Sequence, residues 1–212
     1  MTPDETHRRW HERVPLTGSG LVLTPIHLDD APGLLAALGD ALEVAEVLLH
    51  LRLVQPTNLA QTRSMVAEMI AAPDRIAYAQ RLRATGEFVG TTSFYEITPA
   101  TRALAIGHTW LSRRHWRTGV NTESKLLMLT RAFEGLEAER VVWHTDIRNL
   151  RSQQAIERLG AQREGVLRHH RIRLDGSWRD TVQYSMLAEE WPAVRERLRA
   201  ALRRDRSESN HH

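Results

Sequence analysis

The chain has 212 residues, of which 42% are hydrophobic, so one domain with an ordinary core is expected and a wholly disordered protein is excluded. Cysteine is absent, which excludes disulfides, thiolate nucleophiles and cysteine-based zinc sites. The formal net charge is +3, with 29 basic residues nearly balanced by 26 acidic ones, so binding to nucleic acid through bulk charge is not expected.

The basic residues and the N-terminus add two further limits. No apolar run approaches the roughly 20 residues of a membrane span, and the charged first residues lack a signal-peptide core. We therefore expect a cytoplasmic protein without a membrane partner. Lys125 is the only lysine, so nearly all basic side chains are arginines, which bind phosphate in a bidentate way. A genome that prefers arginine codons explains the same bias.

The first third of the chain predicts one strand followed by helices. Residues 1–15 are expected to form a short helix or a loose arm. A strand is predicted at 21–24, and Pro25 ends it. Helical patterns follow at 28–38, 41–53 and 58–71.

Strand patterns dominate the rest of the chain. Strands are expected at 76–83, 87–97, 102–111, 141–145, 166–174 and 178–187. Helices are expected at 122–136, 150–159 and 189–202. Gly86 and Asp175-Gly176 mark hairpin turns, and Gly160 suits a left-handed C-cap. This order predicts a mixed α/β fold around a central sheet.

A basic turn containing glycine joins the strand at 102–111 to the helix at 122–136. It reads Arg113-Arg114-His115-Trp116-Arg117-Thr118-Gly119-Val120-Asn121-Thr122. The first N–H groups of a helix have no partner inside the helix and lie at the positive end of its dipole. The turn therefore predicts an anion site suited to a pyrophosphate. Gly119 would let the backbone come close and tolerates a positive φ.

A second segment, Asn149-Leu150-Arg151-Ser152, opens the helix that ends at Leu159-Gly160. Together the two segments resemble the acyl-CoA site of the Gcn5-related N-acetyltransferase (GNAT) superfamily, and most of all its Rim-type branch of N-terminal acetyltransferases. The family's turn follows the pattern Gln/Arg-x-x-Gly-x-Gly/Ala, in which Arg114 fills the first place and Gly119 the last. Arg117 stands where the first glycine is usual.

The resemblance implies a single-domain GNAT-like fold with a central, mostly antiparallel sheet, splayed between the fourth and fifth strands, and helices on both faces. The domains implied are an arm at 1–17, the GNAT-like domain at 18–188, a C-terminal helix at 189–204 and a disordered tail at 205–212. Acetyl-CoA is the implied cofactor, held by Trp110, Leu111, Arg114, Arg117, Thr118, Gly119, Val120, Asn121, Thr122, Asn149 and Ser152. No metal is expected, because His169 and His170 are neighbours in a strand and face opposite sides.

The catalytic residues implied by the resemblance are Asn149, Ser152 and His108. Ser152 matches the residue that protonates the departing CoA thiolate in Rim-type enzymes, and Asn149 would bind the pantetheine amide or a water. Each also has an ordinary explanation, because asparagine is a favoured N-cap and serine is common in a first helical turn. His108 lies beside the expected cleft and would titrate near neutral pH, although a packing role suits it equally. Other candidate bases are Glu123, His144 and Asp146.

These observations predict an N-acetyltransferase that moves an acetyl group from acetyl-CoA to a primary amine. Direct transfer in a ternary complex is expected, because no cysteine can carry an acetyl-enzyme. The acceptor would be a protein N-terminus or a small-molecule amine, and a homodimer stays open. The alternative is a non-catalytic acyl-CoA sensor or scaffold with a degenerate site, which Arg117 and the unassigned base support.

Overall fold

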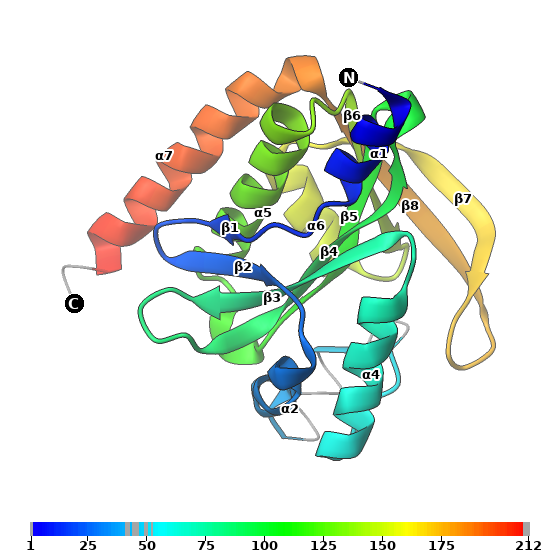
Figure 1. Cartoon of the computed structure of the whole chain (residues 1–212), viewed down its shortest axis with the longest axis vertical. Helices are drawn as coiled ribbons and strands as arrows, with labels where there is room; N and C mark the ends of the chain where they lie inside the picture. The colour runs from blue at the N-terminus through cyan, green and yellow to red at the C-terminus, as the bar shows by residue number, and fades with distance from the viewer. Residues whose placement is uncertain (1, 41–42, 44–46, 49–50, 52, 210–212) are drawn as a thin grey trace.

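A computed structural model describes residues 2–40, 43, 47–48, 51 and 53–209 of the chain, and its centre is one eight-stranded sheet (Figure 1). The strands lie in the order β1-β2-β3-β4-β5-β6-β8-β7. Their bounds are β1 Leu16–Thr17, β2 Leu21–Pro25, β3 Arg75–Leu82, β4 Phe88–Thr98, β5 Ala103–Leu111, β6 Arg140–Asp146, β7 Gln162–Ile172 and β8 Trp178–Leu187. Neighbours pair antiparallel except β5 and β6, which are parallel. The mixed, mostly antiparallel α/β fold is therefore confirmed.

The helices follow the sequence pattern with differences at their ends. Their bounds are α1 Pro3–His11, α2 Ala31–Leu38, α4 Leu59–Ala71, α5 Val120–Thr130, α6 Leu150–Leu159 and α7 Trp191–Ser209. Short helical turns lie at η1 Leu28–Asp30, η2 Pro99–Thr101, η3 Arg113–His115 and η5 Ala188–Glu190. The helix expected at 122–136 is α-helical only to Thr130 and continues as a π-helical turn, η4 Arg131–Gly135.

Three further expectations concern the ends of the chain and the early helices. Residues 1–15 contain a helix, α1, and Thr2 and Glu5 form a capping box at its N-terminus. Helix α7 runs to Ser209, past the end of the C-terminal helix expected at 189–204, and 210–212 lie outside the described residues. Most of the helix expected at 41–53 also lies outside them.

Helices cover both faces of the sheet. Along β3, Ile76 and Tyr78 pack into the core that α5 and α7 complete, whereas Ala77 and Ala79 pack into the core under α2 and α4. This alternation follows from the two-residue period of a strand. Figure 1 shows α7 lying along α5 on one side and α2 beside α4 on another. Among the described helices, none combines the length and apolar character that crossing a bilayer requires.

The parallel pair β5 and β6 separates part-way along its length. Pairing joins Ala103 to Arg140 and Ala105 to Val142, and the described structure has no pairing between these strands beyond that point. Both strands continue toward their carboxyl ends, where the basic turn follows β5 and helix α6 follows β6. The opening lies between the fourth and fifth strands predicted from the sequence, and a crevice at the carboxyl ends of adjacent parallel strands is a common ligand site.

Candidate active site

The turn that leads into α5 has an unexpected backbone. Gly119 has φ −64° and ψ −9°, an ordinary right-handed conformation that does not use the tolerance of glycine for a positive φ. The left-handed residue is Arg117, with φ 60°. A glycine would adopt that conformation without strain. The family pattern usually has a glycine at this place, which fits a backbone with a positive φ. Arg117 adopts the same conformation with some backbone strain.

Gly119 is small because helix α7 lies over it. A Cβ atom built on Gly119 would lie 3.1 Å from Oδ2 of Asp205 and 3.4 Å from Cδ2 of Leu202. Both neighbours come from the last turns of α7. The glycine therefore serves the packing of α7 against the start of α5 as well as the shape of the turn.

The first turn of α5 presents backbone donors, as the sequence predicts. The N–H of Glu123 donates to the carbonyl of Gly119 at 2.9 Å, which is the first bond of the helix. The N–H groups of Asn121 and Thr122 precede this bond, in the turn where a helix supplies no acceptors. The hydroxyl of Thr118 is tied back to the carbonyl of His115 at 2.8 Å. These donors suit an anion.

The arginine side chains of the turn are solvent-exposed. An Nη2 atom of Arg114 lies 2.7 Å from Oε1 of Glu87, which also contacts Nε2 of His115 at 3.1 Å. Such an exposed pair is worth little and is easily replaced by a stronger anion. Arg117 is exposed as well.

The two sequence motifs meet in space. The guanidinium of Arg151, at the start of α6, lies over the Trp116 ring at 3.7 Å from its centre. Trp116 is anchored in turn, because its Nε1 donates to the carbonyl of Leu111 at 2.9 Å. The carbonyl of Trp110 accepts from the Gln80 side chain at 3.3 Å, and the Trp110 ring is buried under α2 and α4. The contact between Arg151 and Trp116 therefore joins the two sides of the β5–β6 opening.

Asn149 is the N-cap of α6, as its ordinary explanation predicts. Its Oδ1 atom accepts the N–H of Ser152 at 3.0 Å. The cap uses the oxygen of the side chain, which leaves its amide nitrogen as the donor that a ligand could meet. Ser152 is half-buried in the first turn of α6.

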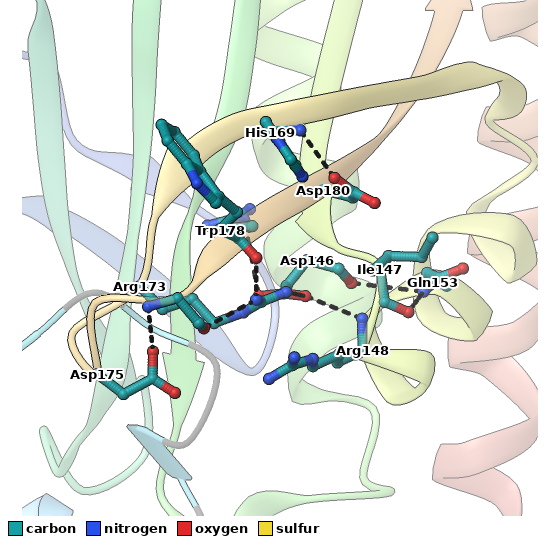
Figure 2. A network of polar contacts seen from close by, with 11 residues as sticks. Asp146, Ile147, Arg148, Gln153, His169, Arg173, Asp175, Trp178 and Asp180 are labelled. Atoms are coloured by element: carbon teal, nitrogen blue, oxygen red, sulfur yellow. Dashed lines mark hydrogen bonds and ion pairs between the residues drawn. The ribbon is translucent and has the colours of Figure 1, made fainter.

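Asp146, at the end of β6, anchors the β7–β8 hairpin through Arg173. Figure 2 shows Arg173 reaching across from the hairpin to this carboxylate, with bonds of 2.7 and 2.8 Å. Burial raises the pKa of Asp146, but hydrogen bonds from Arg173 and from the Arg148 N–H, with the nearby positive charges, outweigh it and lower the pKa. An ion-paired carboxylate of lowered pKa accepts a proton poorly.

Glu123 also holds structure together. It is 7% exposed and accepts hydrogen bonds from the Ser19 hydroxyl at 3.0 Å and the Gly20 N–H at 2.9 Å. These contacts join the first turn of α5 to the turn between β1 and β2. Both hydrogen bonds give Glu123 a structural role.

His108 lies at a β-bulge beside the opening. The register between β4 and β5 shifts there, so His108 and Thr109 both lie opposite Thr92, and His108 has φ 48°. Its ring packs edge-on against Tyr95 at 5.0 Å, and the Tyr95 hydroxyl lies 3.1 Å from Nδ1 of His144. The bulge thus brings His108 and His144, two of the candidate bases, to one tyrosine.

The surroundings of His108 disfavour its protonated form. His108 is exposed at the surface, but the surrounding strands partly desolvate its imidazole. This desolvation, with the charges of Arg75, Arg171 and Arg179, lowers the pKa of His108 to about 4. The imidazole is therefore neutral at physiological pH and can accept a hydrogen bond, but it is a weak base.

Two surface hollows and the side chains of metal-ligating type can be compared with the predicted site residues. One hollow, lined by Leu28, Asp29, Arg63, Ser64 and Ala67, contains none of the predicted site residues. A second hollow, of about 780 Å³, lies along β7 and is lined by residues 166–170, which include His170. Within the described residues, no group of three or more His, Asp or Glu side chains could hold a metal ion.

Comparison with known families decides the class of this protein. A sequence model described as "Acetyltransferase (GNAT) domain" matches residues 20–162. The chain belongs to the GNAT acetyltransferase family. It is 31% identical over 106 residues to a Bacillus subtilis protein named as a ribosomal N-acetyltransferase, YdaF, and this match spans 50% of the chain and 57% of YdaF.

Solved structures agree with this family assignment. The acetyltransferase is 38% identical to a T. thermophilus protein whose crystal structure is described as that of an acetyltransferase, with a TM-score of 0.82 over 91% of this chain and 99% of that one. It shares its fold with Mycobacterium smegmatis RimJ in complex with CoA-disulfide, at 22% identity and a TM-score of 0.73 over 89% and 93% of the two chains. The likeness to RimJ shows the fold, and the family assignment rests on the match of the GNAT domain to residues 20–162.

Lys125 is a feature of this acetyltransferase that the motifs do not predict. It is 4% exposed, and its Nζ donates to the hydroxyls of Thr92 and Thr109 at 3.1 and 2.9 Å. Thr109 belongs to the bulge that positions His108, so the lysine ties α5 to that bulge. Its being the only lysine in an arginine-rich chain is the signal that could have marked it.

Replacing Lys125 with methionine should change how stability depends on pH. Burial lowers the pKa of Lys125 from 10.5 to about 7, so between these values the unfolded chain binds a proton that the folded chain has released. Raising the pH across this window therefore stabilises the folded protein, by at most about 1.4 kcal/mol per pH unit. Urea unfolding at pH 7 and 9.5 should show a smaller gain for Lys125→Met than for the parent. Equal gains in both proteins would mean that Lys125 is charged in the folded state.

Proposed function

We propose that this acetyltransferase moves an acetyl group from acetyl-CoA directly to a primary amine while both substrates are bound. The observation that carries the proposal is the β5–β6 opening, which has the N-termini of α5 and α6 at its mouth and the Tyr95–His108–His144 group beside its floor. Family membership and the CoA derivative bound by RimJ support acetyl-CoA as the acyl donor.

The residues of the turn and of α6 would hold the donor. Backbone N–H groups of 118–122 suit the pyrophosphate, and Arg114 and Arg117 would add charge-assisted hydrogen bonds. Beyond Ala105, β5 has no pairing with β6 among the described residues, and its end at Trp110 and Leu111 would line the pantetheine arm. Acetyl-CoA supplies an acyl group already activated as a thioester. Ser152 would give its proton to the departing sulfur, and Asn149 would orient the arm or a water.

His108 takes a narrower role than the sequence suggests. We propose that it lines the acceptor side as a neutral hydrogen-bond acceptor. Because its pKa is about 4, the ring does not change charge between pH 5 and 8. His108→Phe should therefore lower kcat/KM on an accepted amine several-fold without altering the shape of the pH profile in that range. If an acid limb near pH 6 to 7 disappeared in the variant, His108 would be the base after all.

The transferase activity itself can be tested by thiol release from acetyl-CoA. The panel should contain N-terminal peptides, free amino acids, polyamines and an amine-bearing antibiotic, and the name of YdaF is a reason to include N-termini of ribosomal proteins. Release that depends on one class of amine supports the proposal. Tight CoA binding without turnover on any amine would favour the sensor or scaffold. The cytoplasm is the proposed location, because acetyl-CoA and nascent N-termini meet there and the chain has no cysteine.

A further inference from the structure

Five strands bring basic and aromatic side chains to the sheet face opposite α5. Arg75 pairs with Tyr95 across β3 and β4, and its Nε donates to the Ser93 hydroxyl at 2.9 Å. Tyr95 contacts both His108 on β5 and His144 on β6. The neighbouring residues Ile76, Phe94 and Ile106 point the other way, into the core under α5. These side chains therefore share one surface, which begins where β5 and β6 separate.

The late hairpin closes this surface on its far side. The ring of His170, on β7, lies 5.9 Å from that of His144, and an Nη2 atom of Arg171 lies 3.5 Å from Glu96. On β8, Gln183 hydrogen-bonds His144 at 3.1 Å. His170 also lines the hollow along β7. We refer to Arg75, Tyr95, His108, His144 and Arg171 as the acceptor cluster.

Positive charge outweighs negative charge at the acceptor cluster. Its carboxylates are already engaged, because Glu96 contacts Arg171 and His144, and Asp146 contacts Arg173 and Arg179. Arg75 is different: across the described parts of the chain, no carboxylate lies within ion-pair distance of it. Its Nη2 atom is buried without a hydrogen-bond partner there. A half-buried guanidinium without an anion is costly, so the site favours a ligand that supplies one.

The pKa values of two imidazoles at this surface are lowered in part by the same excess of positive charge. Desolvation comes first and the charges of Arg75, Arg171 and Arg179 second in lowering the pKa of His108. The pKa of His170 is lowered in the same way, by desolvation and then by Arg171, His144 and Arg179, with Glu96 opposing them. A polyamine or an aminoglycoside carries several positive charges and would be repelled from this surface.

We propose that the acceptor carries a carboxylate a few bonds from its reactive amine, and that Arg75 and Arg171 of the acceptor cluster attract this carboxylate. The inference rests on the proposed acetyl transfer and names its substrate class. It favours a peptide whose second residue is acidic, or an acidic amino acid, over polycationic amines. Both sources offer the same chemistry, an amine and a carboxylate on one small fragment.

The test compares short peptide amides that differ only at the second residue, which is Asp, Asn or Lys, with free aspartate as a further acceptor. Acetyl-CoA is the donor, and kcat/KM is measured for each. We expect the Asp peptide to exceed the Asn peptide about tenfold and the Lys peptide by more, with the gap shrinking as salt is added. Transfer to free aspartate but not to the Asp peptide would assign the site to amino acids; the reverse would assign it to N-termini.

Charge-removing variants locate the preference. Arg75→Gln should bring the Asp-to-Asn ratio close to one, and Arg171→Gln, on a more exposed side chain, should reduce the ratio; a thermal melt of each variant checks the fold. Arg199→Gln is the matched control, because Arg199 lies on α7 and pairs with Glu196. An unchanged ratio in both cluster variants, or a Lys peptide as good as the Asp peptide, would overturn the inference.

Two further outcomes separate this inference from the proposed function. If no amine of any charge is acetylated, the proposed function fails and the inference falls with it. If succinyl-CoA is used better than acetyl-CoA, and Arg75→Gln removes that advantage while the peptides show no preference, the arginines recognise the acyl group and the acceptor inference is wrong.

Discussion

Ser152→Ala should slow acetyl transfer about 100-fold while leaving CoA affinity and the fold almost unchanged. A general acid contributes roughly 100-fold or more to a rate, and the variant keeps the Ser152 N–H that the Asn149 cap requires. The measurement is kcat on an accepted amine, together with the KM for acetyl-CoA and a thermal melt.

Asn149 supplies the matched control for this prediction. Asn149→Asp keeps an oxygen for the N-cap but loses the amide donor, whereas Asn149→Ala also loses the cap, at about 1 kcal/mol of stability. A slow but fully stable Asn149→Asp protein would separate catalysis from capping. Parent-like turnover in both Ser152→Ala and Asn149→Asp would show that the reaction centre lies elsewhere.

Gly119→Glu should weaken CoA binding about 100-fold. A carboxylate roughly 6 Å from the pyrophosphate costs about 3 kcal/mol at an effective dielectric constant of about 20, and a factor of ten costs about 1.4 kcal/mol. The new side chain must also displace Asp205 and Leu202 of α7, which touch the position of its Cβ.

Gly119→Gln controls for this steric effect, because it has the same size without the charge. Calorimetric titration of CoA into the parent, the Gln variant and the Glu variant separates the two contributions. We expect a modest loss for Gln and the further loss of about two orders of magnitude only for Glu. If Gln and Glu lose affinity equally, the turn does not hold the phosphates and packing of α7 is the whole effect.

Much of the fold follows from local patterns in the sequence. Gly86, with φ 72°, and Gly176, with φ 80°, lie in the two hairpin turns that the sequence predicts. Gly160 ends α6 with φ 94° as its left-handed C-cap. Strand β1 has only two residues, which is too short to show a period. The end of α5 at Thr130 depends on a π-helical turn, and the length of α7 depends on its packing over Gly119, neither of which leaves a local signal.

The candidate site also has a part that local sequence patterns predict and a part that they do not. The turn before α5 and the start of α6 are contiguous motifs, so their residues could be named from the sequence. The acceptor cluster joins residues from separate strands, and it depends on the sheet register and on the bulge at His108. No spacing in the sequence predicts that bulge, or the contact of Tyr95 with His144. The pKa of His108 likewise depends on arginines that are distant in sequence.

Direct transfer is best tested by a single-turnover experiment that follows the mass of both the enzyme and the acceptor. The enzyme is mixed with acetyl-CoA, with and without an amine it accepts, and both species are weighed as the thiol is released. We predict one added acetyl group on the acceptor amine, none on the enzyme, and no thiol release until the amine is present. An enzyme that becomes acetylated without the amine, and then passes the group on at the rate of turnover, would contradict direct transfer.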